Sequence, residues 1–545
     1  MFVIKLNESH VFFLFQFDSA APGFRGLRLA ACGLTVLLLS GCVVNTSVVD
    51  PLKTSAQSGE TPVVVSITSN TKDIYGFNMI KLRRVVAGEQ RSDFKLVSAN
   101  LVMKKVESAM PGDTSLFIGA LPPGEYEFVE LIDTRANKLL HVYSSIVGSF
   151  NIEAGKSADL GRLIVTRGDF GVQYGRNAQV ASNAQLLQRF APDYSKLFGA
   201  AASPGWSTPH HAQDDVEQFA RAHPAGAECA TEMPDGRVAA ASRMGAVLLR
   251  STQGLWKIIN APSVESLSCV FPVDLPNAEL IAVGESGSLL RKARDSDKLL
   301  PVDTGNLPPG NLLRIGGTPQ DGWYVMHRKG DALNIFRANQ LDAGDWRSVY
   351  HSTLPGSWLH GPGLLWTWQD AERIGYALEN GLIGELDYRT GKLAERFSPH
   401  KKSLTQFIHQ ANGTQSVLVA AGLGGRFPDA YVSRDRGQNW TTIVSPFKVL
   451  MSPVAPLNDG KLLMEAGMYN ERALLVSSDE GKTWGPYVSY TLRNAPLIFP
   501  SGLALNIQED FKGNVSIYSS MDNARTWKLE HSNQDLLSTL QQRKQ

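Results

Sequence analysis

The hydrophobic residues between Pro62 and Val165 come in short runs that turn-forming residues separate. Runs such as Pro62–Thr68 are rich in Val, Ile, Phe and Tyr, and Pro122-Pro123-Gly124 supplies a turn between two of them. Runs of this composition and length are typical of strands. The expected strands are residues 62–68, 77–82, 94–103, 115–121, 125–132, 139–145 and 160–165. So many short strands in about a hundred residues predict a β-sandwich over residues 62–167.

The hydrophobic period changes after residue 167. Between Gln179 and Leu197 the apolar residues recur at helical spacing, and Pro192 interrupts them. A second helix is expected from Thr208-Pro209 to about Ala222, with acidic residues in its first turns, where the helix dipole favours them. We therefore expect residues 168–224 to form a helical connector.

Hairpins recur from residue 225 onward. Segments 241–250, 283–291 and 378–386 each contain a strand, a turn with Gly and a second strand. Trp256, Trp346 and Trp440 follow at intervals of 90 and 94 residues, about two structural units each, and turn residues near 295–298 and 388–392 fill the intermediate positions. This period predicts about seven β-sheet units within residues 225–531. Residues 532–545 are expected to form a short C-terminal helix or tail.

Three copies of one short pattern lie near the C-terminus: Ser433-Arg-Asp435-Arg-Gly437-Gln-Asn439-Trp440, and its equivalents at 477–484 and 520–527. Their tryptophans are 44 and 43 residues apart, the length of one four-stranded propeller blade. In each copy Asp and Ser can bond the turn's N–H groups, Gly can adopt a positive φ, and Trp can cover apolar surface. The pattern residues are Ser433, Asp435, Gly437, Trp440, Ser477, Asp479, Gly481, Trp484, Ser520, Asp522 and Trp527, and Ala524 replaces the third Gly.

These copies resemble the Asp-box, Ser-x-Asp-x-Gly-x-x-Trp, of the BNR-repeat β-propellers, a superfamily that includes sialidases, sortilin-like receptors and the photosystem II assembly-factor family. The hairpins with Gly followed by a turn and Trp are most similar to the photosystem II assembly-factor type. That resemblance implies a seven-bladed β-propeller rather than the six blades of sialidases. The expected fold is therefore all-β, an N-terminal β-sandwich followed by a short helical connector and the propeller. A fold of this kind does not by itself specify an activity.

The N-terminal region has the order of a secretion signal. Arg25 and Arg28 precede the apolar run 29–39, which has signal-peptide length and is short for a membrane span. Leu39-Ser40-Gly41-Cys42 resembles the bacterial lipobox, in which signal peptidase II cuts before the cysteine and the thiol carries diacylglycerol. The resemblance implies that residues 1–41 form the signal-peptide region and that Cys42 is lipidated. A buried strand that ends in a cysteine is the alternative interpretation.

Residues 42–61 are then the lipidated cysteine and a tether, since Asn45–Thr61 is rich in Ser, Thr and Gly. Acyl chains such as palmitate would anchor the protein to a membrane. The residues after Cys42 lack the Asp that retains some lipoproteins at the inner membrane, which favours the outer membrane of a bacterial cell envelope. Residues 1–24 fit neither a signal peptide nor the mature fold, so we expect the true start to lie downstream of them. Because no Met lies between Met1 and Cys42, that start would be a non-AUG codon.

Composition excludes some partners. The chain of 545 residues has 43% apolar and 19% charged residues and a formal net charge of +1. Near-neutrality argues against a nucleic-acid surface. Of the four cysteines, Cys32 leaves with the signal peptide and Cys42 is lipidated. Cys229 and Cys269 are 40 residues apart, one repeat, and a disulfide between them is one hypothesis for an exported protein. Two reduced, buried cysteines are the alternative.

Three further patterns suggest chemistry but have simpler explanations. The cluster His210, His211, Asp214 and Asp215 contains an i, i+4 pair that could bind a metal, although a solvated acidic helix start explains it better. Gly422-Leu-Gly424-Gly425 precedes a strand and not a helix, so it reads as a loop and not a phosphate site. Trp358, Trp366 and Trp368 can stack on sugars, but packing between sheets is favoured. The sequence predicts neither a cofactor nor a metal ion.

A sialidase needs three arginines that converge on a carboxylate, a Tyr-Glu nucleophilic pair and a general acid. Arg250, Arg291 and Arg314 recur near the edges of the units, but the family's Arg-Ile-Pro motif is missing and Arg314-Ile315-Gly316 is the nearest string. No catalytic residue is assigned. The leading hypothesis is a non-catalytic binding or scaffold lipoprotein whose propeller contacts a protein or glycan. An exo-glycosidase of sialidase type is the alternative.

Overall fold

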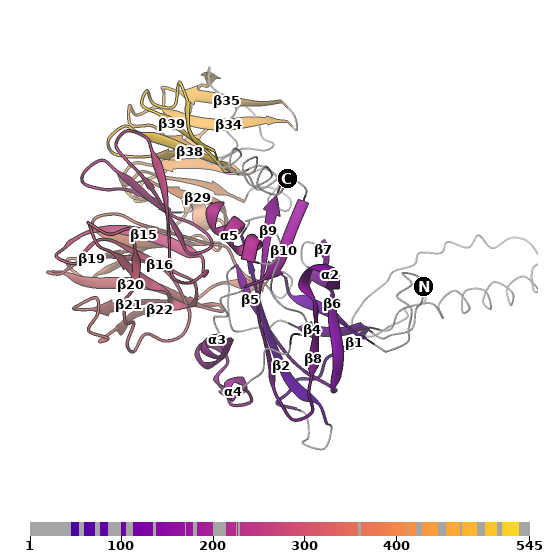
Figure 1. Cartoon of the computed structure of the whole chain (residues 1–545). Coiled ribbons are helices and arrows are strands. Elements are labelled where there is room, and N and C mark those ends of the chain that lie inside the picture. Colours follow the sequence, from indigo (N-terminus) through magenta and orange to yellow (C-terminus); the bar gives the residue numbers. More distant parts are fainter. Residues whose placement is uncertain are drawn as a thin grey trace, which may run out of the picture.

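The structure is a computed structural model in which strands form 54% and helices form 8% of the described residues. The mostly β fold that the sequence predicts, with many four-stranded sheets, is therefore confirmed. Figure 1 shows the N-terminal sheets on one side of the C-terminal sheets. The residues that the structure describes are 45–53, 59–70, 77–85, 100–104, 113–134, 138–168, 171–177, 183–199, 206, 214–224, 226, 229–357, 361–410, 412–420, 428–444, 454–468, 471–487, 496–509 and 515–532.

Two sheets form the N-terminal part. The first has the strand order β1-β4-β3-β6-β7, with β8 also pairing with β6, and the second has the order β10-β9-β2-β5. The strands of the first sheet are β1 (Asn45–Ser47), β3 (Met79–Arg84), β4 (Asn100–Lys104), β6 (Gly124–Asp133), β7 (Lys138–His141) and β8 (Ser149–Ile152). Those of the second are β2 (Thr61–Ser69), β5 (Thr114–Leu121), β9 (Ala158–Gly168) and β10 (Gly171–Arg176).

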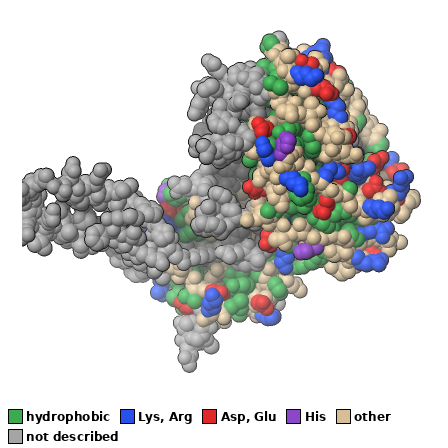
Figure 2. All heavy atoms as spheres, turned by 180° about the vertical axis from the view of Figure 1, so that it is seen from behind, with side chains coloured by type: hydrophobic (Ala, Val, Ile, Leu, Met, Phe, Trp, Pro, Cys, Tyr) green, Lys and Arg blue, Asp and Glu red, His purple; other side chains and the backbone are tan. Residues whose placement is uncertain are grey.

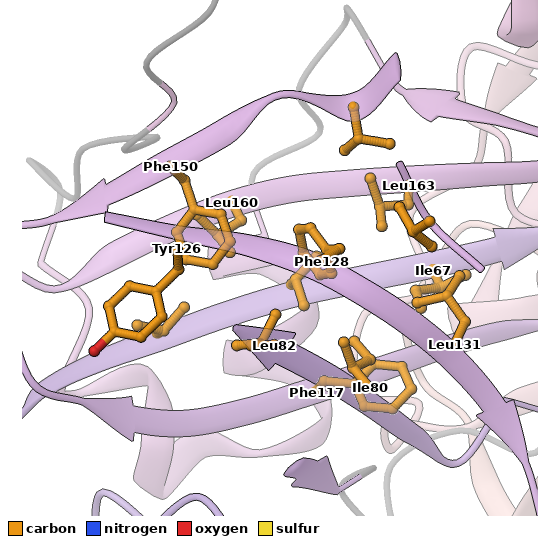
Figure 3. Close-up of a cluster of buried hydrophobic side chains, with 14 of the residues drawn as sticks. Ile67, Ile80, Leu82, Phe117, Tyr126, Phe128, Leu131, Phe150, Leu160 and Leu163 are labelled. Carbon is orange, nitrogen blue, oxygen red and sulfur yellow. The ribbon is translucent and has the colours of Figure 1, made fainter. Parts of the chain in front are cut away.

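A hydrophobic core lies between these two sheets (Figure 3). Alternate residues of β2, among them Val63, Val65 and Ile67, are fully or almost fully buried there, and Phe128 and Phe150 meet them from the first sheet. The two phenylalanine rings are 5.5 Å apart. The period of two places one face of each strand in this core. Burying apolar surface from two facing sheets is the main stabilising contribution in such a two-layer unit.

The structure differs from the sequence expectation at three strands of this part. The expected tether begins with β1, which pairs in parallel with β4, and Val49 bridges to Ala120. The expected connector begins with β10, which pairs antiparallel with β9. Strand β8 pairs with β6 and was also not expected. These strands are three to six residues long, too short for a period of two to stand out, and the partner of β1 is also distant in sequence.

The connector region also contains helices. α3 (Asn183–Phe190) and α4 (Pro192–Ser195) flank Ala191, as the break expected at Pro192 predicts, and they pack on the outer face of β2 and β5. α5 (Asp214–Ala222) lies between the N-terminal sheets and the C-terminal sheets (Figure 1). The short α2 (Ser144–Val147) replaces the end of an expected strand. Among the described residues, no helix has the length and apolar character to cross a membrane.

Seven four-stranded antiparallel sheets follow one another from residue 229 to residue 532. The first three sheets are β11–β14 (Cys229–Glu232, Val238–Ala241, Ala246–Arg250, Trp256–Asn260), β15–β18 (Leu267–Leu275, Ala278–Gly284, Leu289–Lys292, Leu299–Pro301) and β19–β22 (Asn311–Thr318, Gly322–Lys329, Ala332–Ala338, Arg347–Thr353). A two-stranded hairpin, β23 (Gly356–Ser357) with β24 (Gly361–Pro362), comes before the fourth sheet.

The fourth and fifth sheets are β25–β28 (Leu365–Gln369, Arg373–Leu378, Leu382–Asp387, Leu393–Phe397) and β29–β32 (Leu404–His409, Gln415–Val419, Asp429–Ser433, Thr441–Ile443). The sixth and seventh are β33–β36 (Ala455–Pro456, Leu462–Met468, Glu471–Ser477, Gly485–Pro486) and β37–β40 (Leu497–Ile498, Ala504–Glu509, Val515–Ser520, Lys528–Ser532). Each of the seven sheets is a meander in which neighbouring strands pair in sequence order.

Each of these sheets buries both faces against its neighbours. Separate apolar clusters join the first sheet to the second, the second to the third, and so on to the seventh. A last cluster joins the seventh to the first, with Leu505 and Ile517 packed against Val238 and Leu248. Burial on both faces explains why strands such as β12 and β16 are almost continuously apolar. These contacts form a closed circuit, and we call the seven sheets the ring.

Candidate functional site

The two ends of the ring's sheets carry different connections. In a four-stranded meander, the turns between strands one and two and between strands three and four lie at one end. The middle hairpin and the link to the next sheet lie at the other end. We call these the corner face and the hairpin face of the ring. The three copies of the pattern that resembles the Asp-box, called the Asp-box copies below, follow β31, β35 and β39, the third strands of their sheets, so they lie on the corner face.

Each Asp-box copy closes its turn with the same set of hydrogen bonds. In the first, the Ser433 hydroxyl donates to Asp435 (2.7 Å) and accepts from the N–H of Gly437 (2.7 Å). The backbone N–H of Asn439 donates to Asp435 Oδ1 at 2.8 Å. The copies at Ser477-Asp479 and Ser520-Asp522 repeat the serine contacts, and there Thr483 and Thr526 donate to the carboxylates. In all three copies these hydrogen bonds lie within the turn and hold its conformation.

The hydrogen bonds keep the corner carboxylates ionised. The backbone N–H of Asn439 lowers the pKa of Asp435 to about 2. Burial raises the pKa of Asp522, but the hydrogen bonds from Thr526 outweigh it and lower that pKa to about 2. The hydroxyl and N–H of Thr483 lower the pKa of Asp479. A carboxylate that accepts several donors is stabilised in its charged form, so none of the three is suited to act as a general acid.

The Asp-box tryptophans pack at the boundary with the preceding sheet. Trp440 lies against the cluster between the fourth and fifth sheets, Trp484 against the next and Trp527 against the one after. The indole N–H of Trp484 donates to the carbonyl of Val444 at 2.7 Å, and that of Trp527 to Ala524 at 3.0 Å. The role expected of them, covering apolar surface between sheets, agrees with this arrangement.

A buried polar cluster surrounds the first corner. Arg436 lies between Asp435 and Gly437, at the second turn position when the count begins at the aspartate. It contacts Asp370 Oδ2 at 3.1 Å and Glu385 Oε1 at 3.5 Å. Glu385 also accepts from Arg396 at 2.7 Å and from Gln415 at 3.1 Å. These side chains come from the fourth and fifth sheets, so the cluster fixes the two sheets to each other through charge-assisted hydrogen bonds.

His409 joins this cluster as a neutral group. Its Nε2 lies 3.5 Å from Asp370, and its ring stacks on Trp368 with centroids 5.0 Å apart. Burial lowers the pKa of His409. Burial would raise the pKa of Asp370, but contacts with His409, the N–H of Glu372 and Arg436 lower it to about 2. The pair combines a base with a carboxylate, but His409 has 3% of its side-chain surface exposed and cannot reach a substrate.

The inner strands of the ring are connected by side chains. Arg314 on β19 donates to the carbonyl of Thr367 on β25 (2.8 Å) and to that of Ser268 on β15 (2.9 Å). Gln369 accepts from the N–H of Ile315 and donates to the carbonyl of Val270. Most of the guanidinium N–H groups of Arg314 therefore donate to backbone carbonyls. They connect the second, third and fourth sheets, and few N–H donors remain that could bind a carboxylate ligand.

The structure does not bring the three arginines of the sialidase alternative together. Arg250, on β13, makes a bidentate pair with Glu530 of β40, with both distances 2.7 Å. Arg291 lies on β17, and Arg314 is held as described above. Arg250 and Arg291 lie on the third strands of the first and second sheets, whereas Arg314 lies on the first strand of the third sheet. Arg250 and Arg314 are both bound to structural partners.

Cys229 on β11 and Cys269 on β15 are joined in a disulfide, with Cα atoms 4.9 Å apart. They occupy the innermost strands of neighbouring sheets, as the spacing of one repeat suggested. Trp366 and Trp368 pack between the fourth and fifth sheets. Cys42, His210, His211, Trp358 and residues 422–425 lie outside the described residues. Asp214 and Asp215 begin α5.

Among the described residues, no group of three or more His, Cys, Asp or Glu side chains is placed so that it could hold a metal ion. On the face that Figure 2 shows, basic and acidic side chains are interspersed, as the formal net charge of +1 suggests.

The sequence pattern did not identify Glu285, a buried carboxyl group at the junction with the N-terminal sheets. It lies in the short helix η1 (Glu285–Gly287) on the hairpin face and accepts two hydrogen bonds from Thr114. The sequence showed only that Glu285 lies in a hairpin with Gly. It could not show the contact with Thr114, because the two residues are 171 positions apart. Arg436 was also missed, because the pattern leaves the position between Asp435 and Gly437 free. Glu385 was missed because it lies within strand β27, outside the pattern.

No family model matches this chain, and no curated protein matches it. Solved structures that match part of this chain include YCF48 bound to D1 peptide, with 14% identity, a TM-score of 0.38, and coverage of 54% of this chain and 91% of that one. A Mycobacterium tuberculosis puromycin-hydrolyzing peptidase has 13% identity, a TM-score of 0.39, and coverage of 58% and 54%. TolB from Acinetobacter baumannii has 11% identity, a TM-score of 0.29, and coverage of 55% and 77%. These are β-propeller proteins.

Proposed function

We propose that the protein is a lipid-anchored binding or scaffold protein of the bacterial cell envelope. In this proposal the N-terminal sheets form a β-sandwich, the ring is a seven-bladed β-propeller with Asp-box corners, and Cys42 carries the lipid. The ring contacts a protein or a glycan and does not transform it. The favoured location is the outer membrane.

One observation carries the non-catalytic part of this proposal. The polar groups that a hydrolase would use are engaged in holding the sheets together. Arg250 is paired with Glu530, Arg314 with backbone carbonyls, and His409 is buried beside Asp370. A catalytic group must reach the reacting atoms. Side chains placed in this way instead make the corner face rigid, which favours recognition of a partner over its surface.

The anchor is tested by changing its attachment atom. Cys42→Ala should shift the protein from the membrane fraction to the soluble fraction, because the thiol that carries the lipid is lost. In the unchanged protein, the mature N-terminal peptide should begin at Cys42 and carry the mass of the lipid. A Cys32→Ala variant is the matched control and should remain membrane-bound. Membrane retention of the Cys42→Ala variant would contradict the anchor.

The binding role is tested with the full chain immobilised and with purified envelope glycans and proteins offered as ligands. Arg434 and Glu480 are half-exposed on neighbouring corners and lie 3.2 Å apart, so changing both to Ala alters the corner face without touching the core. We expect a saturable ligand whose Kd rises at least tenfold in this variant. The exposed Lys402→Ala change near the hairpin face is the control and should leave Kd unchanged. Equal binding by both variants would contradict a role for the corner face.

The sialidase alternative predicts a different result. A fluorogenic sialoside would be hydrolysed by the full chain, and Arg314→Ala would abolish the turnover. Turnover of this kind would overturn the non-catalytic proposal. Absence of turnover together with saturable binding would support it.

A further inference from the structure

Glu285 connects the two parts of the molecule. Its carboxyl group accepts the N–H of Thr114 (3.1 Å), the hydroxyl of Thr114 (3.1 Å) and the N–H of Ser266 (3.2 Å). Thr114 begins β5 of the N-terminal sheets, and Ser266 precedes β15 of the ring. Glu285 is 4% exposed. The contact therefore lies in the interior of the junction, where a charge is costly unless it is compensated.

The junction can accommodate Glu285 both with and without a proton. The Thr114 hydroxyl also lies 3.0 Å from the Thr68 hydroxyl, and either of these can be the donor. When Glu285 is ionised, Thr114 donates to it and accepts from Thr68. When Glu285 is protonated, its O–H can donate to Thr114, and Thr114 then donates to Thr68. Rotation of two hydroxyl groups is sufficient to change between these states.

The charges around Glu285 do not compensate it. Asp113 is paired with Arg243 at 3.0 Å and Glu265 with Arg162 at 2.8 Å, so those cations already have partners. No Lys or Arg forms an ion pair with Glu285 within the part of the chain that the structure describes. Arg189 of α3 approaches the neighbouring Gly287 and donates to Thr304. Burial, followed by the charges of Asp113 and Glu265, raises the pKa of Glu285 to about 7.

The same junction covers part of the hairpin face. Met244, in the middle hairpin of the first sheet, is buried against Ile164 of β9, Ala220 of α5 and Val264. Asn70 after β2 donates to the carbonyls of Ala220 and His223. The turns at 242–246 and 284–288 are therefore covered as long as the N-terminal sheets stay docked.

We propose that Glu285 is a proton-controlled contact that sets how firmly the N-terminal sheets dock on the ring. Protonated, it holds Thr114 and β5 against the turns at 242–246 and 284–288. Ionised, after the proton leaves to water, it loosens this docking and increases access to the covered part of the hairpin face. The inference does not depend on the binding role of the corner face.

The direction of the effect follows from linkage. The docked state binds the proton more tightly than the undocked state, in which the pKa of Glu285 returns toward its ordinary value of 4.5. The contribution of Glu285 to docking is therefore complete below about pH 4.5 and is lost as the pH rises through about 7. Between pH 6 and pH 8 the docking equilibrium should weaken about tenfold, since one pKa unit corresponds to a tenfold change.

Hydrogen exchange of the full chain tests this inference. Protection of the amides in the peptides covering 113–118, 242–246 and 284–288, corrected for intrinsic exchange, should fall about tenfold from pH 6 to pH 8. Glu285→Gln keeps the size and removes the titration, so its protection should change less than twofold over this range. Asp297→Asn, an exposed carboxylate of the second sheet, is the control and should follow the unchanged protein.

Constant protection in the unchanged protein would overturn the proposal, as would a tenfold change that persists in Glu285→Gln. Circular dichroism at pH 6 shows whether the Gln variant is folded. If it is not, Asp113→Asn decides the question. Removal of that negative charge should move the midpoint of the change to lower pH, and an unchanged midpoint would contradict the proposal.

Discussion

At the scale of single residues, the corners depend on backbone conformations that most side chains disfavour. The second and third turn positions have positive φ in all three Asp-box copies, for example 60° at Glu480 and 80° at Gly481. In the third copy Ala524 adopts 65°. A non-glycine residue there costs about 1 kcal/mol. The serine and aspartate hydrogen bonds and the burial of the Ala524 methyl group offset that cost.

The space around the glycine decides whether it can be replaced. A Cβ at Gly481 would lie 2.6 Å from Ile443 Cδ1, whereas a Cβ at Gly460, which also has positive φ, would contact nothing within 4 Å. Gly481→Ala should therefore lower the free energy of unfolding by about 1–3 kcal/mol more than Gly460→Ala, because only the former overpacks the core. Urea denaturation of the two variants measures the difference. Equal losses would show that the backbone alone sets the requirement for glycine.

At the scale of elements, the ring must be closed between its last and first sheets. The pair of Arg250 and Glu530 lies at this boundary, with 9% and 6% of the side chains exposed, and Trp256 also donates to Glu530 at 3.1 Å. Removing one partner leaves a buried charge without compensation. Arg250→Met should lower the free energy of unfolding by about 3–5 kcal/mol.

The control for this closing pair is Lys257 with Asp297, whose side chains are 56% and 61% exposed. Lys257→Met should cost at most about 1 kcal/mol, because solvent screens an exposed pair. The double variant Arg250→Met with Glu530→Met should recover much of the loss of the single change. If the single change costs no more than the control, the boundary is held by its apolar cluster alone.

The disulfide is a second connection between elements, in this case β11 and β15. Its loop of 40 residues predicts that removing it lowers the free energy of unfolding by about 4 kcal/mol through the entropy of the unfolded chain. The measurement compares denaturation of the oxidised protein with that of the Cys229→Ser, Cys269→Ser double variant. Peptide mapping without reductant comes first, and finding both residues as free thiols would contradict the connection.

At the scale of the whole molecule, the sequence predicts what is repeated and local. The Asp-box copies locate the turns of the fifth to seventh sheets, and the hairpins with Gly indicate the earlier ones, where Arg250-Ser-Thr-Gln-Gly254 lacks the aspartate. It does not predict how parts that are distant in sequence meet. Glu285 contacts Thr114 across 171 residues, and β1 joins the sheet beside β4. A local pattern carries no information about such contacts because either partner alone looks ordinary.

The docking of the N-terminal sheets on the ring also depends on a buried ion pair. Arg162 of β9 and Glu265 of the ring lie 2.8 Å apart, with 1% and 9% of their side chains exposed. Arg162→Met should uncouple the two parts, because Glu265 would then lose its counter-charge beside Glu285 and Asp113. Loss of this ion pair should lower the free energy that couples the two parts by about 3–5 kcal/mol. Calorimetry should resolve two transitions in place of one joint transition.

A second substitution tests whether the two transitions arise from the uncompensated charge of Glu265. Arg162→Met with Glu265→Met leaves no buried charge at this position and similar volume, so the joint transition should return. An Arg162 variant that unfolds in one transition at an unchanged temperature would mean that the apolar contact of Met244 with β9 and α5 holds the two parts together. In that case Glu285 would titrate without changing access to the hairpin face, so this experiment also bounds how much one proton can do to the whole molecule.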